Sequence, residues 1–253
     1  MAGHSKWKNI RIRKGKQDAI RGKLFTKMAR EIIVAAKAGG GDPALNARLR
    51  VAVDLAKANS LPAENIKRAI DRGTGAIDGA AYEEIVYEAK GPGGAAIVMQ
   101  CSTENRNRTV ADIRAACVRN GGTMAENGAV MWQFRYGGQL EFVGADEDEL
   151  TMAALDAGAD DVVPHDENDG DGDAGITVLT PVERLHQVNT ALEKDGFKAE
   201  SVALTYTATN KAELSKDDQI KLLKLLDALD DLDDVQETYT NVDILPELLE
   251  DEE

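Results

Sequence analysis

The order of strand and helix patterns between residues 138 and 206 constrains the fold of this chain more than any other feature. Short apolar runs predict four strands, at QLEFVG, DVVPH, GITVLT and SVALTY. Amphipathic spacing predicts a helix at DEDELTMAALDAGA, after the first strand, and another at PVERLHQVNTALEKDG, before the last. The resulting order, βαββαβ, is that of a ferredoxin-like split unit.

The patterns on either side of this unit are each incomplete. Before it, YEEIVYEA, a Gly-Pro-Gly-Gly turn and AAIVMQCST predict a β-hairpin, followed by a helix over about 109–120 and a strand over 129–134. After it come one Leu-rich amphipathic helix near 220–232 and a strand at VQETYTNVDI. The economical interpretation is that these two remainders form one domain, into which the βαββαβ unit is inserted.

The first quarter of the chain has helical periodicity only. From Asp18 an apolar stripe predicts one helix, which ends at three consecutive glycines, 39–41. Asp42 and Pro43 are typical of an N-cap and a first helical turn, so a second helix is expected to begin there. Its apolar face would contain Leu45, Leu49, Val53 and Ala56. Pro62 opens a third helix.

The predicted fold class is therefore α+β: an N-terminal helical domain followed by two α/β sandwich-like domains, the second of which is inserted into the first. The expected limits are 1–77 for a basic arm and the helical domain, 78–136 plus 207–245 for the discontinuous domain, 137–206 for the inserted ferredoxin-like domain, and 246–253 for an acidic tail.

The charge of the chain is divided unequally along its length. The net charge of −15 comes from 30 Lys and Arg against 45 Asp and Glu, and on its own it argues against a nucleic-acid partner. Residues 1–75, however, hold 17 basic and 6 acidic side chains, a net of +11, whereas residues 76–253 hold 13 and 39, a net of −26. This asymmetry indicates an anion-binding module attached to an acidic body.

Several other classes of protein are not expected. The chain has only two cysteines, no Cys/His cluster and no apolar run long enough to span a bilayer, so we expect a cytoplasmic protein without metal or cofactor. The match to G-x-G-x-x-G at 170–175 lies within DENDGDGDAG, whose aspartates would repel a pyrophosphate. No constellation supports catalysis, so no catalytic residue is assigned and the protein is not expected to be an enzyme.

The basic N-terminal segment is the leading candidate site, because its charge is dense, nearly unopposed and combined with an indole that can stack on a base. A solvated stretch, or one resembling a mitochondrial presequence, is the alternative. The predicted nucleic-acid-binding residues are Lys6, Trp7, Lys8, Arg11, Arg13, Lys14, Lys16, Arg21, Lys23, Lys27 and Arg30.

A second, smaller candidate lies between a predicted strand and the start of a helix. Asn105, Arg106, Asn107 and Arg108 could hold phosphate oxygens there, with help from the helix dipole. The alternative is a loop whose asparagine and threonine side chains only cap the helix.

Four blocks of the chain resemble the YebC/PmpR family, which includes the mitochondrial translational activator of cytochrome c oxidase. They are GHSKWKNIRIRKGKQDAIRGKLFTKMAREI, LPAENIKRAIDRGTG, YEAKGPGGAAIVMQCSTENRNRTVADIR and LDDVQETYTNV. The resemblance implies three domains, the first of them helical, and no enzymatic residues. The family has been described both as DNA-binding transcriptional regulators and as translation factors that relieve ribosome stalling, notably at proline-rich stretches.

The leading hypothesis is thus a non-enzymatic, nucleic-acid-binding regulator of gene expression. Its expected partner is duplex DNA, ribosomal RNA or the ribosome, with no membrane and no small-molecule substrate. A ribosome-associated translation factor is the first alternative, and a protein-interaction scaffold is the second.

Overall fold

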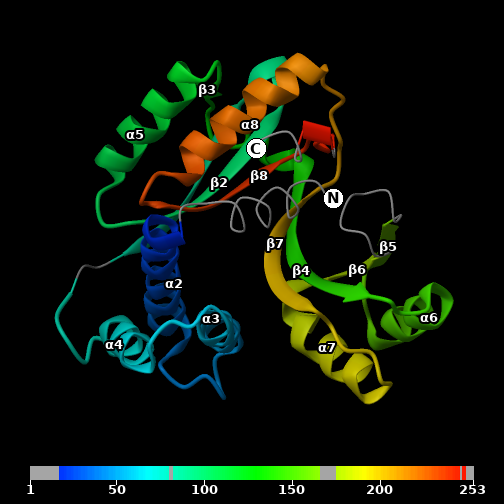
Figure 1. Cartoon of the computed structure of the whole chain (residues 1–253). Helices are drawn as coiled ribbons and strands as arrows, with labels where there is room; N and C mark the ends of the chain where they lie inside the picture. The colour runs from blue at the N-terminus through cyan, green and yellow to red at the C-terminus, as the bar shows by residue number, and fades with distance from the viewer. Residues whose placement is uncertain (1–16, 80–81, 166–174, 246, 249–253) are drawn as a thin grey trace. The chain divides into compact units, whose positions relative to one another are not determined.

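The computed structural model describes residues 17–79, 82–165, 175–245, 247 and 248, and for residues 17–21 it describes the backbone only (Figure 1). The chain forms two compact units. The first consists of the described part of Ile10–Met131 together with Leu214–Thr240. The second consists of the described parts of Trp132–Glu213 and Asn241–Glu253. The domain limits expected at residues 77, 136, 206 and 245 stay predictions.

The first unit begins with three helices, α2 (Gln17–Gly39), α3 (Ala47–Ala58) and α4 (Ala63–Gly73). The apolar stripe of α2 packs against both other helices, and Ile32 and Leu49 are fully buried between them. Gly73 permits the close approach of α4 to α2, since a Cβ at this position would lie 2.5 Å from the backbone oxygen of Ile33. These three helices are the N-terminal helical region expected from the periodicity.

The prediction that the second helix begins at Asp42 is wrong. Asn46 is the N-cap of α3: its side-chain oxygen accepts a hydrogen bond from the Leu49 amide at 3.1 Å. Its amide group also donates to the backbone oxygens of residues 35 and 40, both at 2.8 Å, so Asn46 is fixed from two sides. Asp42 instead lies in the turn before α3, where its carboxylate accepts a hydrogen bond from the Ala44 amide at 2.9 Å. Leu45, expected in the core, is 85% exposed.

The same unit contains a four-stranded antiparallel sheet in the order β3-β1-β2-β8. The strands are β1 (Glu83–Lys90), β2 (Ala96–Thr103), β3 (Thr123–Met124) and β8 (Val235–Thr240). The β1–β2 hairpin was predicted, whereas the short β3 was not. Because β8 pairs with β2, residues before and after the inserted unit share one sheet, which confirms the insertion.

Two helices, α5 (Arg106–Arg119) and α8 (Lys216–Asp230), cover one face of this sheet (Figure 1). Their apolar faces account for much of the core: Ile113 of α5 and Leu222, Leu225 and Leu226 of α8 have no exposed surface. The Leu-rich helix expected near 220–232 is therefore a core helix.

The second unit has the strand order β5-β6-β4-β7, with every neighbouring pair antiparallel. Its elements are β4 (Phe134–Val143), α6 (Glu147–Ala157), β5 (Asp161–His165), β6 (Gly175–Thr180), α7 (Leu185–Lys194) and β7 (Ser201–Ala208). Counted from β4, this order is 2-3-1-4, as in ferredoxin-like sheets, so the predicted βαββαβ unit is confirmed. The core lies between the sheet and its two helices, where Leu140, Leu150 and Leu192 are fully buried.

The strand predicted over 129–134 is wrong, because the backbone there has another partner. The amides of Gly128, Val130 and Met131 donate hydrogen bonds to the carboxylate of Glu88, at 2.5, 2.7 and 2.9 Å. Amides that are held by a side chain cannot also join a strand ladder. A 3₁₀ turn follows, and β4 then runs as one long strand from Phe134.

Candidate nucleic-acid interface

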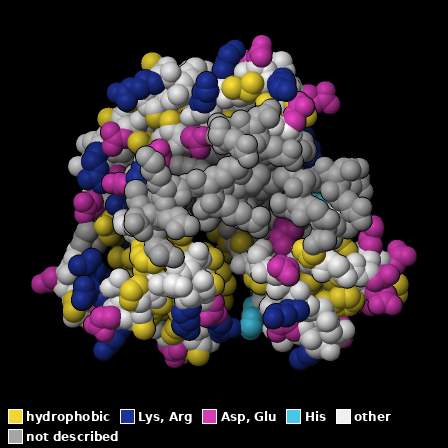
Figure 2. Space-filling model, in the orientation of Figure 1, with side chains coloured by type: hydrophobic (Ala, Val, Ile, Leu, Met, Phe, Trp, Pro, Cys, Tyr) yellow, Lys and Arg dark blue, Asp and Glu magenta, His cyan; other side chains and the backbone are white. Residues whose placement is uncertain are grey.

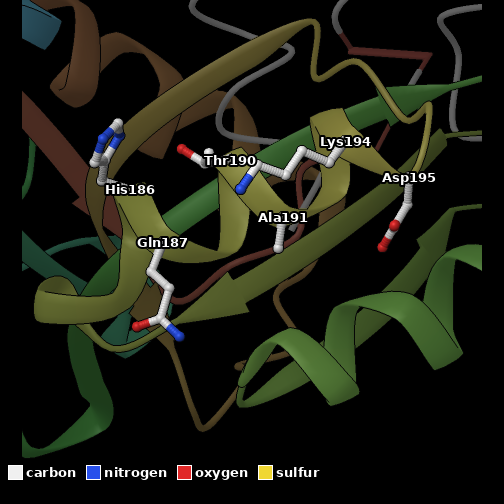
Figure 3. A pocket seen from close by; sticks show the side chains of 6 residues that line it. All are labelled: His186, Gln187, Thr190, Ala191, Lys194 and Asp195. Carbon is white, nitrogen blue, oxygen red and sulfur yellow. The ribbon is translucent and has the colours of Figure 1, made fainter.

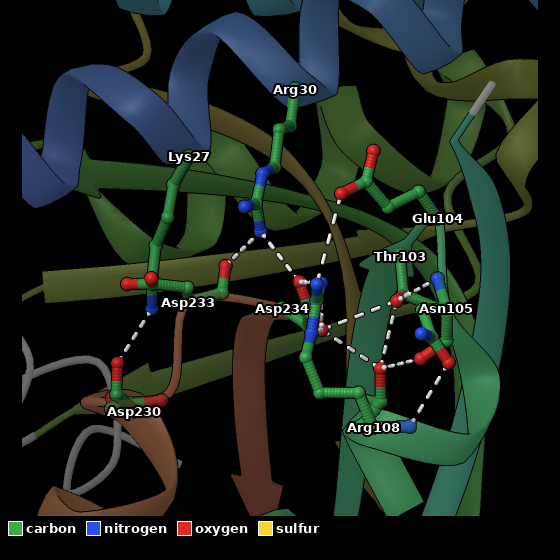
Figure 4. Close-up of polar contacts among 10 residues, drawn as sticks. Lys27, Arg30, Thr103, Glu104, Asn105, Arg108, Asp230, Asp233 and Asp234 are labelled. Atoms are coloured by element: carbon green, nitrogen blue, oxygen red, sulfur yellow. Dashed lines mark hydrogen bonds and ion pairs between the residues drawn. The ribbon is translucent and has the colours of Figure 1, made fainter. Parts of the chain in front are cut away.

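Three of the predicted cations, Lys23, Lys27 and Arg30, lie on one face of α2 and contact an acidic turn formed by residues 230–234. Figure 4 shows the contacts of Lys27 and Arg30. Lys23 forms an exposed ion pair with Asp231 at 3.3 Å. Lys27 donates to the backbone oxygen of Asp230, at 2.9 Å, where α8 ends. Backbone carbonyls at a helix C-terminus carry partial negative charge, so this end of α8 attracts cations even without its carboxylates.

Asp234 is the centre of the contact. It is only 5% exposed, and its carboxylate accepts two hydrogen bonds from the terminal nitrogen Nη2 of Arg108, at 2.9 and 3.0 Å. The hydroxyls of Thr109 and Thr103 donate to one of its oxygens, at 2.9 and 3.2 Å, and Arg30 pairs with the other at 3.2 Å. One buried carboxylate thus joins α2, the end of β2 and the first turn of α5.

Opposing effects act on the pKa of Asp234. Burial raises the pKa, whereas hydrogen bonds from Arg108 and Thr109, together with the positive charges of Arg108 and Arg30, lower it. The balance holds the pKa below its ordinary value, so the carboxylate stays ionised at neutral pH.

The second predicted cluster is divided among different roles. Asn105 caps α5, accepting a hydrogen bond from the Arg108 amide at 3.1 Å, which is the alternative that sequence reasoning left open. Arg106 forms a two-pronged pair with Glu83, with both contacts at 2.6 Å. Asn107 is exposed. Of the four residues, Arg108 alone reaches the Asp234 carboxylate.

These geometries predict different consequences for the two arginines of α5. Arg108→Ala should lower the thermal unfolding midpoint, because Asp234 stays buried after losing its strongest partner. Arg106→Ala should leave the midpoint nearly unchanged, because its pair with Glu83 is solvent-exposed. Calorimetry on the two variants tests whether Arg108, and not Arg106, stabilises the fold. Equal unfolding midpoints would contradict this assignment.

The remaining predicted residues are placed only in part. Lys6, Trp7, Lys8, Arg11, Arg13, Lys14 and Lys16 lie outside the described residues, as does the acidic loop at 166–174. For Arg21 the structure describes the backbone alone, which is helical.

Other cations of the helical region differ sharply in their surroundings. Arg48 of α3 is held between Glu31 of α2 and Glu84 of β1 and donates to both carboxylates. Burial, followed by the charges of Glu84 and Glu237, raises the pKa of Glu31 despite its contact with Arg48. Helix α4 was not among the predicted sites, although three of its side chains are exposed and have no ion-pair partner among the described residues: Lys67, Arg68 and Arg72.

The described residues offer little that resembles a catalytic centre. Both cysteines are buried, and burial raises the pKa of Cys101 to about 12 and that of Cys117 to about 11, which makes them poor nucleophiles. A shallow depression runs along α7, but the side chains that line it, from His186 to Asp195, point in different directions (Figure 3). Within the described residues there is no group of metal-binding side chains, and no helix combines the length and hydropathy of a membrane span.

Comparison with known proteins decides the family. The chain matches the N-terminal domain of TACO1/YebC proteins over residues 5–76, and their second and third domains over residues 82–242. The chain belongs to the TACO1/YebC family. The resemblance noted from the four sequence blocks is therefore confirmed.

Relatives of this TACO1/YebC protein match it over nearly their whole length. A protein of Aromatoleum aromaticum is 54% identical over 242 residues, which cover 95% of this chain and 98% of the relative. A protein of Neisseria gonorrhoeae is 50% identical over 242 residues, with the same coverage. Both are named "probable transcriptional regulatory protein".

A solved structure has the same fold as this TACO1/YebC chain. The crystal structure of the conserved hypothetical protein Aq1575 from Aquifex aeolicus gives a TM-score of 0.78 at 38% sequence identity. The match covers 90% of this chain and 92% of that one, so it includes both the helical region and the two sheets.

Proposed function

We propose that this TACO1/YebC protein is a non-enzymatic regulator of gene expression that binds the phosphate backbone of a nucleic acid through its basic N-terminal segment. The observation that carries the proposal is the concentration of charge. Residues 1–37 hold 11 basic side chains against Asp18 and Glu31, in a chain whose remainder is strongly acidic. Confined positive charge of this kind attracts a polyanion, while the acidic body limits how much of the protein can approach it.

The contacts of α2 separate one predicted cation with a structural role, Arg30, from two that stay near the proposed interface, Lys23 and Lys27. Arg30, whose side chain is 12% exposed, is assigned to holding Asp234. Lys23 and Lys27 form the margin of the proposed interface, where a phosphate must compete with the acidic turn. The primary phosphate contacts are therefore proposed to come from the six cations Lys6, Lys8, Arg11, Arg13, Lys14 and Lys16, with Arg21, while Trp7 is proposed to stack on a base.

The names of the relatives support transcriptional regulation, and we propose duplex DNA as the target. A translation factor that binds ribosomal RNA would use the same cations, because phosphate contacts position a protein without reading sequence. Binding measurements with duplex DNA, structured RNA and ribosomes distinguish these two targets.

Deleting residues 1–16 should weaken binding to the physiological target at least about a hundredfold at 150 mM salt, since each lost phosphate contact removes counterion release. The deletion stops where α2 begins, so the described helices keep all their residues. Fluorescence anisotropy with duplex DNA and with a structured RNA, and cosedimentation with purified ribosomes, measure the loss. If about six phosphates of duplex DNA are contacted, log K should fall with log salt with a slope near −5.

Removal of residues 250–253, all of them acidic, is the control and should leave every affinity unchanged or slightly higher. Unchanged binding to all three targets after deletion of residues 1–16 would refute the proposal. Loss of ribosome binding alone, with no measurable binding to DNA, would replace transcriptional regulation with translational regulation.

A further inference from the structure

The outward face of α6 carries large apolar side chains in contact with solvent. Met152 is 70% exposed and Leu155 is 51% exposed, and their spacing of three residues places them side by side on the helix. The opposite face of the same helix is well packed, since Leu150 and Ala154 are fully buried in the core. Met152 and Leu155 are therefore exposed on a helix whose other face is packed in the core.

The surroundings of these two side chains are acidic. Residues 136–165 contain eight Asp and Glu and no Lys or Arg. Asp148 precedes Met152 by one helical turn and Asp156 follows it by one turn, so both carboxylates flank the apolar pair. At the lower right of Figure 2, where Figure 1 shows α6, acidic side chains surround hydrophobic ones.

Two cations from outside this segment approach the far end of the helix. Arg184 lies near Gly158, and Arg135 pairs with Asp160. Gly158 and Asp160, the residues that these arginines approach, both follow the last residue of α6. The face that contains Asp148 and Met152 therefore keeps its negative charge.

This combination of charge and hydropathy selects one kind of occupant. A nucleic acid or an anionic membrane would be repelled by the carboxylates. A second copy of the chain, placed face to face by a two-fold axis, would bring the same carboxylates together. A cationic segment of another protein satisfies both features, because Lys and Arg can lay their aliphatic stems on Met152 and Leu155 and direct their charges to Asp148 and Asp156.

We propose that the outward face of α6 binds a cationic amphipathic segment of a partner protein. This role does not depend on nucleic-acid binding, for the two surfaces carry opposite charge. Together they give the protein one face for a polyanion and another for a basic protein.

A synthetic 14-residue peptide of lysine and leucine with helical amphipathic spacing is a suitable probe. The control peptide has the same lysines, with glutamine in place of leucine. Titrated into the full chain at 150 mM salt, the leucine peptide should bind at least about tenfold more tightly than the control peptide, because only it can cover the apolar pair.

The double variant Met152→Ser/Leu155→Ser should abolish this tenfold preference while leaving the fold and DNA affinity unchanged. Val118→Ser is the matched control, since Val118 is 69% exposed on α5, and it should keep the preference. Equal binding of both peptides to the unmodified chain, or an unchanged preference in the double variant, would overturn the proposal.

Two further measurements exclude the other occupants. Sedimentation velocity should show the same oligomeric state for the unmodified chain and the double variant. A dimer that depends on Met152 would instead identify a second copy as the occupant. Deleting residues 1–16 should leave peptide affinity within about twofold. A tenfold rise would show that the chain's own basic segment occupies this face, and would equally overturn the proposal.

Discussion

Asp234→Ala should lower the free energy of unfolding by about 3 kcal/mol, because it removes one partner of a buried ionic network and leaves the others in place. The carboxylate accepts hydrogen bonds from Arg108, Thr103 and Thr109 and pairs with Arg30, whose guanidinium has little access to water. Urea unfolding at pH 7 measures the loss. Asp231→Ala is the matched control, since the pair of Asp231 with Lys23 is exposed and should contribute almost nothing.

The same network predicts a pH dependence with a definite sign. The pKa of Asp234 is lowered in the folded protein, so its contribution to stability is complete above the unfolded-state pKa of about 3.9 and disappears as the pH falls through the lower folded-state value. Between pH 5 and pH 2 the unmodified protein should therefore lose more stability than Asp234→Ala. Parallel curves of stability against pH for the unmodified protein and Asp234→Ala would contradict the assigned role of Asp234. So would an equal loss of unfolding free energy in the Asp231 and Asp234 variants.

Glu88→Ala should cost about 3 kcal/mol or more, for a different reason. Glu88 is 4% exposed and is the acceptor for three backbone amides, those of Gly128, Val130 and Met131. Its loss leaves these donors without their acceptor in a segment that has no strand partner to replace it. Glu88→Gln retains one acceptor oxygen, so its free energy of unfolding should lie between those of the unmodified protein and Glu88→Ala.

Glu126→Ala is the matched control for Glu88, because Glu126 is exposed in the same segment. It should leave both stability and local dynamics unchanged. In the Glu88 variants, native-state hydrogen exchange should accelerate at residues 128, 130 and 131 before it does so elsewhere. Equal exchange in the Glu88 and Glu126 variants would show that the carboxylate does not hold this segment.

The second sheet was predictable because its signals are local. The short apolar runs within GITVLT and DVVPH indicate strands by themselves, and the predicted bounds of these two strands are the observed ones. The start of α3 was not predictable, since Asp42 and Asn46 are both good caps by type. Asn46 caps the helix because its amide also reaches residues 35 and 40, a tertiary contact with no local signature.

The candidate site was predictable only as a charge density. The sequence shows where cations concentrate, but pairing with Asp234 or Asp231 depends on residues about two hundred positions further along the chain, which periodicity does not report. The cap role of Asn105 was foreseeable, because asparagine three residues before an exposed amide is a local motif. The role of Arg108 was not, because its acceptor lies 126 positions away.

The pairing of β8 with β2 also imposes an order on how the protein is made. Arg30, Thr103 and Arg108 are all synthesised long before Asp234, which is 131 positions after Thr103. The inserted unit closes its own sheet from strands that are near one another in the chain, so this sheet is complete once β7 is available. The enclosing domain is finished last, when the turn that leads into β8 supplies the Asp234 carboxylate that joins its helical layer to its sheet.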